Sequence, residues 1–289
     1  MADGIIIIDK PQDWTSMDVC AKLRGIFHER RIGHAGTLDP MATGVLPVFV
    51  GRATRAVEFA SESEKEYVAG LRLGVETNTQ DTTGTVLAER PVSVSQAELE
   101  QVLGQFRGEI RQIPPMYSAI KVGGKKLYEL ARKGQEVERQ PRAVTIHSLT
   151  LEEQTGPADY TLRVRCSKGT YVRTLCHDIG RALGCGGCMS GLRRTMAAGI
   201  KLEDALPLEQ VLQAEGPASL LLGVDAYFAD RPVLILKPPA EKKVRNGMSL
   251  FLPETPDGEY RVYGAEGTFL ALSRMERGRL TTIKSFFPV

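Results

Sequence analysis

A stretch from Arg30 to Val48 combines a single carboxylate with three glycines and two prolines, and it carries the clearest chemical signal in the chain. Glycine lets backbone approach a ligand closely, and a proline directly after Asp39 holds the aspartate in an extended conformation that aims its side chain. An aspartate held in this way is a candidate nucleophile or general base. Local chemistry alone leaves a second interpretation open, in which Asp39 only closes a turn through its side chain.

Three further side chains could take part in chemistry, but each also has a plainer interpretation. Tyr67 could stack on a flat substrate, yet it alternates with apolar residues as a core residue would. Arg173 could hold a carboxylate in an ion pair, yet it could equally be a charge on a helix surface. His34 lies in the glycine-rich loop and could be an ordinary solvated histidine.

The cysteines require a metal site and a redox site to be weighed. Cys185 and Cys188 form a Cys-x-x-Cys pair, and Cys176 and His177 lie shortly before it. Two adjacent residues do not easily reach one tetrahedral ion together, so the spacing argues against zinc. The pair also lacks the βαβ context of a thioredoxin-like dithiol. An odd number of cysteines, five, favours reduced thiols over a disulfide framework.

Charge is unevenly distributed along a chain whose formal net charge is only +2. Residues 161–200 hold seven lysines or arginines against one acid, and residues 121–142 hold seven against three. Residues 201–230 instead hold one base against six acids. Such segregation predicts basic surfaces that attract phosphate groups, with solvated basic faces of no special function as the alternative.

The elements that must position these residues follow from hydrophobic patterning and capping signals. The alternating run at 67–73, the turn residues 81–84 and the short run at 85–87 together predict a hairpin. The other expected elements are a strand at 5–9, a helix at about 16–28 capped by Thr15 or Ser16, a strand at 45–50, a helix beginning at Ser95, strands at 149–151 and 160–166, and a helix at about 170–183.

Strands and helices mix without regular βαβ alternation, so we expect an α+β fold built on a mixed, largely antiparallel sheet flanked by helices. Near Asp230 an acidic helical stretch gives way to short strand-like runs separated by glycine and proline. We therefore place a domain boundary there, with a larger domain at 1–230 and a small β-rich domain at 231–289. The apolar run Ile5–Ile8 is too short for a signal peptide, and no stretch approaches the roughly 20 apolar residues of a membrane span, so we expect a cytoplasmic protein without membrane contact.

Ordered motifs between residues 5 and 200 resemble those of the TruB family of bacterial tRNA pseudouridine-55 synthases. The loop around Asp39 is similar to the catalytic motif of this family, and a weaker similarity links 243–248 to its small RNA-binding module. The chain departs from the family pattern at Asp13, where glycine is usual and makes the turn more permissive. The other similar motifs are 9–16, 65–67, 112–121, 165–173 and 191–195.

This resemblance implies a pseudouridine synthase fold with a PUA-type RNA-binding domain at 231–289. It implies that Asp39, Tyr67 and Arg173 are catalytic, with Arg173 pairing with Asp39 and holding the pKa of its carboxyl low. Tyr67 would stack on the target base. The residues that it places against the substrate are Lys10, His34, Gly36, Thr37, Tyr171, Leu192 and Arg193. The implied reaction is an isomerisation of uridine, so neither a cofactor nor a metal is expected.

The resemblance further implies a stand-alone enzyme that acts on uridine 55 in the T-arm stem-loop of tRNA, as a monomer that requires no protein partner. Asp39 could attack the sugar or the base, or take a proton from the sugar. Two other functions remain open on the sequence. One is a guide-RNA-dependent pseudouridine synthase, which shares these core motifs. The other is a non-catalytic RNA-binding module or tRNA-folding chaperone, which would need none of the three catalytic residues.

Overall fold

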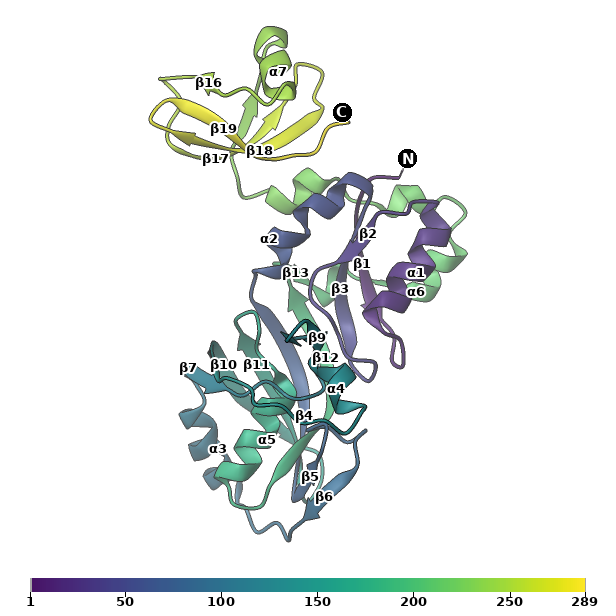
Figure 1. Ribbon diagram of the computed structural model, residues 1–289, viewed down its shortest axis with the longest axis vertical. Helices are drawn as coiled ribbons and strands as arrows, with labels where there is room; N and C mark the ends of the chain where they lie inside the picture. The colour runs from purple at the N-terminus through teal and green to yellow at the C-terminus, as the bar shows by residue number, and fades with distance from the viewer. Residues whose placement is uncertain (1, 289) are drawn as a thin grey trace.

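A ten-stranded mixed sheet runs through most of the molecule in the computed structural model, which describes residues 2–288 (Figure 1). Its order is β14-β1-β3-β12-β4-β11-β10-β7, with β2 paired to β3 and β13 paired to β12. Only the β1/β14 and β12/β3 pairs are parallel, which confirms the predicted mixed, largely antiparallel sheet. The strands are β1 (Gly4–Lys10), β2 (Ile32–His34), β3 (Thr43–Val50), β4 (Lys65–Leu73), β7 (Gly108–Gln112), β10 (Arg142–Gln154), β11 (Asp159–Cys166), β12 (Gly187–Ala197), β13 (Ile200–Lys201) and β14 (Leu206–Pro207).

Helices flank this sheet and bury its apolar side chains. α1 (Ser16–Phe27) and α6 (Leu208–Gln213) pack against the β1–β3 end, whereas α3 (Gln96–Gln105) and α5 (Val172–Ala182) cover strands β4, β10, β11 and β12. The predicted caps are confirmed, because Thr15 and Ser95 each form a capping box with the acid three residues later. The short helices are α2 (Val57–Ser61), α4 (Leu127–Ala131) and α7 (Pro238–Arg245).

The predicted hairpin between residues 67–73 and 85–87 is wrong in its first strand. β4 lies in the middle of the sheet between β11 and β12, and the hairpin instead joins β5 (Val75–Thr77) to β6 (Val86–Glu89). The strand is interrupted at Gly74, where φ is +83° and an added Cβ would lie 2.7 Å from the carbonyl oxygen of Arg90. A residue with a side chain does not fit there, so β4 ends before the turn at 81–84.

A second, five-stranded sheet occupies the C-terminal part of the chain, at the top of Figure 1. It has its own apolar core around Val262, Leu270 and Leu280, as expected for a small β-rich PUA-type fold. Phe228, Leu272 and Phe286 nevertheless share a core with the N-terminal strands. The strands are β15 (Val233–Ile235), β16 (Leu250–Phe251), β17 (Gly258–Tyr263), β18 (Phe269–Glu276) and β19 (Arg279–Ser285).

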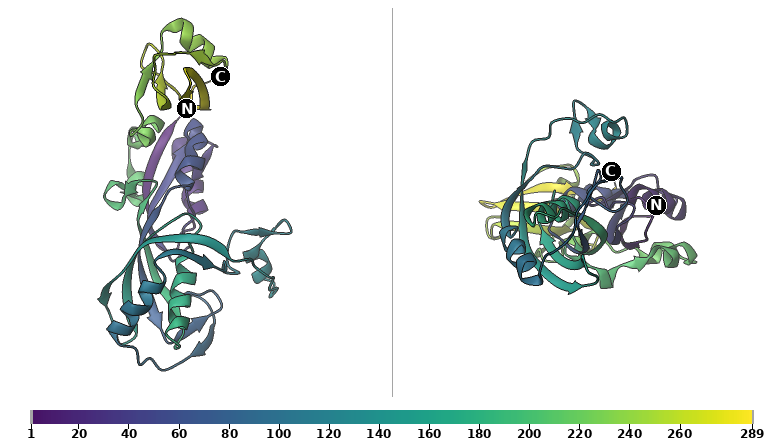
Figure 2. Two further views of the ribbon diagram at one scale, coloured as in Figure 1. Left: turned by 90° about the vertical axis from the view of Figure 1, so that its left-hand side faces the viewer. Right: turned by 90° about the horizontal axis from the view of Figure 1, so that it is seen from below.

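A segment between β7 and β10 projects from the body of the molecule and is called the arm below (Figure 2). It covers residues 113–141 and contains the two-stranded ribbon β8 (Lys121–Val122) and β9 (Lys125–Lys126), followed by α4. Its small core of Met116, Leu127 and Leu130 is separate from the others. Across residues 2–288, the helices are all too short or too polar to traverse a lipid bilayer.

Candidate active site

The loop that carries Asp39 is fixed by a buried arginine on the neighbouring strand. Arg194 of β12 is fully buried, and its guanidinium donates to the carbonyl oxygens of Val45 (2.7 Å) and Gly36 (3.0 Å). Gly44 lies against the Arg194 backbone with φ at +102°, and an added Cβ would lie 2.2 Å from the Arg194 carbonyl oxygen. Arg194 belongs to the segment 161–200, for which we expected a basic surface that attracts phosphates, but its side chain has no exposed surface.

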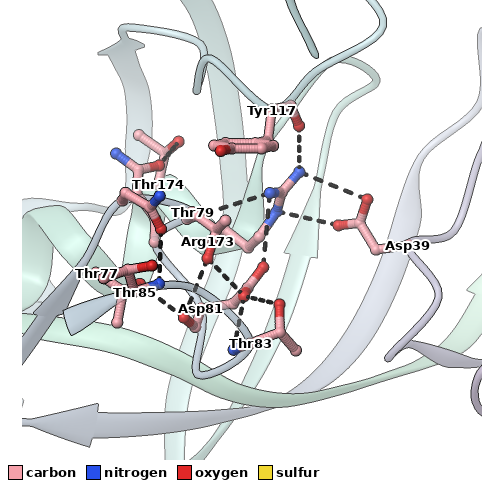
Figure 3. Close-up of polar contacts among 11 residues, drawn as sticks. Asp39, Thr77, Thr79, Asp81, Thr83, Thr85, Tyr117, Arg173 and Thr174 are labelled. Carbon is pink, nitrogen blue, oxygen red and sulfur yellow. Dashed lines mark hydrogen bonds and ion pairs between the residues drawn. The ribbon is translucent and has the colours of Figure 1, made fainter. Parts of the chain in front are cut away.

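Arg173 and Asp39 come together as expected, at the start of α5 (Figure 3). Arg173 Nε lies 3.0 Å from Asp39 Oδ2, and the arginine side chain is only 7% exposed. The guanidinium also donates to the carbonyl oxygens of Tyr117 (2.8 Å) and Thr79 (3.2 Å). Asp39 keeps 36% of its side chain exposed, so the pair has one buried member and one that a substrate can reach.

A second carboxylate at this site, Asp81, was missed from the sequence because its segment was interpreted only as a turn. Asp81 Oδ2 lies 3.6 Å from Arg173 Nη1, and its side chain is 5% exposed. Its Oδ1 accepts hydrogen bonds from Thr79 Oγ1 (2.8 Å), Thr83 N (3.0 Å) and Thr83 Oγ1 (2.6 Å). The two threonines at spacing two on either side of the aspartate are a signal that could have indicated a held carboxylate.

Burial raises the pKa of the Asp39 carboxyl, and this effect exceeds the lowering by Arg173. Asp81 raises the pKa further as a like charge, and Lys10 lowers it. The expected low pKa of Asp39 is therefore wrong in its net direction. That prediction considered the arginine but neither the loss of water around the carboxyl nor the second aspartate.

Tyr67 and His34 both lie beside Arg194. Tyr67 is directly opposite Arg194 in the β4/β12 register, and only 7% of it is exposed. Burial raises the pKa of Tyr67, and Arg194 opposes this rise. His34 ends β2, and burial lowers its pKa, so its ring is neutral at pH 7. Its Nδ1 is buried and has no hydrogen-bond partner among residues 2–288.

Lys10 braces the loop that carries Asp39. Its Nζ is enclosed by the carbonyl oxygens of Pro11 (2.8 Å), Trp14 (2.5 Å) and Pro40 (3.3 Å), and burial lowers its pKa to about 8. The lysine is fully buried. Its ammonium therefore joins the turn after β1 to the segment that follows Asp39. Asp13, which replaces the usual glycine, has φ at +67° and donates its N–H to Pro40. The turn therefore keeps a left-handed conformation despite the side chain.

The remaining predicted substrate contacts differ in accessibility. Arg193 is 42% exposed, but it donates to Asp9 Oδ2 (2.7 Å) and to Thr43 Oγ1 (3.0 Å). Thr37 is exposed and Gly36 half-buried on the loop, Leu192 is half-buried at the edge of the core, and Tyr171 immediately precedes α5.

The predicted basic surface at 161–200 is mostly neutralised. Acids at the start of β4 and just before it face the arginines and lysines of β11 and its following turn. The pairs are Arg163 with Glu66 (2.9 Å) and Glu152 (2.5 Å), Arg165 with Glu64 (2.7 Å), and Lys168 with Glu62. On the arm, in contrast, Lys121, Lys125 and Lys133 form no ion pair with residues 2–288 and are exposed. The arm therefore carries accessible positive charge, which most of the 161–200 segment does not.

No group of three or more His, Cys, Asp or Glu side chains within residues 2–288 is arranged to hold a metal ion. The five cysteines are free and buried. Burial raises the pKa of the Cys188 thiol to about 11 and that of Cys176 still further. Both thiols are therefore protonated at neutral pH.

The fold is that of the pseudouridine synthases. In it, Arg173 at the start of α5 meets Asp39 in the loop between β2 and β3. The fold superimposes on a chain in the crystal structure of a Cbf5-Nop10-Gar1 complex with a TM-score of 0.74 at 27% identity. The match covers 99% of this chain and 85% of that chain. A chain in an H/ACA RNP bound to a substrate RNA containing 2′-deoxyuridine gives a TM-score of 0.72 at 26% identity, with coverage of 99% and 85%.

Sequence comparison identifies the family within the pseudouridine synthases. Residues 24–172 match the TruB family pseudouridylate synthase N-terminal domain, and residues 173–223 match the tRNA pseudouridylate synthase B C-terminal domain. A tRNA pseudouridine synthase B of Azoarcus sp. is 44% identical over 97% of this chain and 93% of its own length. The enzyme of that name from Clostridium kluyveri is 41% identical over 98% and 99%. The chain belongs to the TruB family.

Proposed function

We propose that this protein is a stand-alone tRNA pseudouridine synthase that converts uridine 55 in the T-arm loop to pseudouridine. The observation that carries the proposal is the 3.0 Å ion pair between buried Arg173 and accessible Asp39. It is supported by relatives named tRNA pseudouridine synthase B that match nearly the whole chain. A non-catalytic RNA-binding module would need neither this pair nor Asp81 beside it.

The reaction breaks the bond between N1 and C1′, turns the base and joins C5 to C1′. It involves no net oxidation, so the chain needs only a carboxylate, a group that moves a proton and a site that excludes water. Asp39 supplies the carboxylate, either as a nucleophile toward sugar or base or as a base toward a sugar proton. Arg173 favours the ionised form of Asp39. We assign to Tyr67 the roles of stacking on the base and passing a proton.

A uridine inside a folded loop must leave its stack before it reaches Asp39. The unpartnered Nδ1 of neutral His34, beside the catalytic loop, supports a role for this residue next to the vacated base. The exposed lysines of the arm, together with Tyr128 beneath Lys126 and Arg132, suit contact with phosphates and bases. We assign catalysis to residues 1–230 and additional RNA contact to 231–289.

The second candidate is a guide-RNA-dependent enzyme, because the structural neighbours include Cbf5 in a complex with Nop10 and Gar1. The relatives that match nearly the whole chain bear the name of the tRNA enzyme instead. We therefore propose that the protein acts as a monomer without a protein partner or guide RNA. Incubation of the purified protein with a bare tRNA transcript separates the two, since only a stand-alone enzyme forms pseudouridine there.

The deciding experiment maps pseudouridine in a tRNA transcript treated with the wild-type protein or with Asp39→Asn. We expect modification at position 55 by the wild type and none by the variant. The amide retains the size of the side chain but cannot act as a nucleophile or base, so tRNA affinity should stay nearly unchanged. Pseudouridine formed by Asp39→Asn at the wild-type rate would refute the assignment of Asp39.

A further inference from the structure

Gln112 makes a paired contact with the backbone at the start of α5. Its Oε1 accepts a hydrogen bond from Tyr171 N (3.0 Å), and its Nε2 donates to the Tyr171 carbonyl oxygen (3.2 Å). The side chain is only 1% exposed. An amide is the side chain that offers a donor and an acceptor side by side, so Gln112 matches the two backbone groups of one residue as a neighbouring strand would.

Tyr171 is the residue that precedes the first turn of α5, and its own side chain does not cap the helix. Arg173, two residues later, lies in that first turn and reaches Asp39, Tyr117 and Thr79. The direction of an arginine at a helix start depends on the backbone that leads into the helix. Gln112 holds both backbone groups of Tyr171, the residue that leads into the helix.

Gln112 also stands at the root of the arm. It is the last residue of β7 and pairs with Arg142, the first residue of β10, so the arm emerges between these two. Five residues beyond Gln112, the carbonyl oxygen of Tyr117 accepts from Arg173. One short segment, 112–117, therefore joins the base of the arm both to the start of α5 and to the arginine itself.

We propose that Gln112 is a positioning residue for catalysis. Through its two hydrogen bonds to Tyr171 it holds Arg173 in line with Asp39 and ties that alignment to the root of the arm. The inference rests on the proposed function, because it concerns the same isomerisation. Gln112 does not touch the reacting atoms, and its effect is on turnover and not on RNA binding.

The test measures kcat and KM on a T-arm transcript for Gln112→Met and Gln112→Glu between pH 5.5 and 8. Methionine has a similar length and removes both hydrogen bonds, so kcat should fall on the order of 100-fold with KM nearly unchanged. Glutamate keeps the acceptor for Tyr171 N but gains a donor only when it is protonated. Its activity relative to the wild type at each pH should therefore rise as pH falls, because burial brings the pKa of the new carboxyl into this range.

A purely electrostatic effect of Gln112→Glu would have the opposite sign. A new negative charge would raise the pKa of Asp39. Activity relative to the wild type would then decrease as the pH is lowered. Gln154→Glu is the matched control, since Gln154 is an exposed glutamine at the far end of β10 and its relative activity should not depend on pH.

Three results would overturn the inference: wild-type kcat in Gln112→Met, a relative activity of Gln112→Glu that is flat or falls with acid, or joint loss of kcat, RNA affinity and cooperative unfolding in both variants. The last would mark Gln112 as a general structural residue. An inactive wild type would instead refute the proposed function. An active wild type with a fully active Gln112→Met would refute only this inference.

Discussion

At the scale of single residues, the site is defined by one buried guanidinium between two carboxylates. Arg173 approaches Asp39 on one side and Asp81 on the other, and both Arg173 and Asp81 are almost fully buried. A buried arginine needs opposite charge nearby, and removing one partner of such a pair is costly. Because Asp81 is held by threonines, Asp39 is the carboxylate that remains open to a substrate.

This arrangement predicts the acid side of the pH profile. Because the pKa of Asp39 is raised, its carboxylate is lost as pH falls through a value above the roughly 3.9 of an ordinary aspartate. Asp81→Asn removes a like charge, so the apparent pKa on the acid limb of kcat/KM should move down. Asp178→Asn, at a half-exposed position on α5, is the control and should leave the limb in place. An upward shift in Asp81→Asn would contradict the assignment of the limb to Asp39.

At the scale of elements, the loop that carries Asp39 depends on close contact between β3 and β12. The two strands pair in parallel at Gly44 and Arg194, where no side chain fits on β3. The arm is a second element whose contribution is separable, because its small core is its own and its lysines are exposed. One element therefore holds the loop that carries Asp39, and the other presents exposed positive charge.

Gly44→Ala should destabilise the protein by about 1–3 kcal/mol, since it adds a Cβ at a left-handed φ against the Arg194 carbonyl. Denaturant unfolding measures the change. Gly104→Ala is the matched control in α3, where an added Cβ meets nothing within 4 Å, and it should raise stability by up to about 1 kcal/mol. Equal effects of the two substitutions would argue against the close β3/β12 contact.

For the arm, tRNA affinity should fall steeply with salt. Lys125→Gln should lower the slope of log K against log salt by about 0.7 to 0.9 if this lysine meets one phosphate. Arg165→Gln removes a charge that is also exposed but that Glu64 already neutralises, so its slope should stay close to that of the wild type. Titrations of labelled tRNA across a salt series compare the two. A larger change for Arg165→Gln would place the RNA on the sheet and not on the arm.

At the scale of the whole molecule, the C-terminal sheet is tied to the N-terminal strands by packing and by polar contacts. Phe228 lies among Phe59, Phe269 and Phe286 at ring distances of 5.4, 6.5 and 6.0 Å. Arg55 donates to the Ser285 carbonyl oxygen at 2.9 Å. The two parts should therefore unfold together, although the second sheet has a core of its own.

Phe228→Ala should lower the free energy of unfolding by about 3–5 kcal/mol, because it opens a cavity in the shared aromatic core. Phe251→Ala, at a C-terminal position that is 73% exposed, should change it by less than about 0.5 kcal/mol. Thermal melts followed by near-ultraviolet circular dichroism report both variants. A Phe228→Ala protein that kept its wild-type midpoint would show that the two sheets are energetically independent.

The features that could be predicted from the sequence are local or depend on short spacing. The capped starts of α1 and α3, the mixed sheet, the Asp39 loop and its partner Arg173 all follow from patterns within one segment or from motif resemblance. Which residues face each other across long separations in the chain depends on the packed fold. Glu64 neutralises Arg165 from 101 positions away, and burial both removes Arg194 from the surface and raises the pKa of Asp39. Charge counted along a chain cannot predict these outcomes, because screening and desolvation depend on distances that only the packed fold determines.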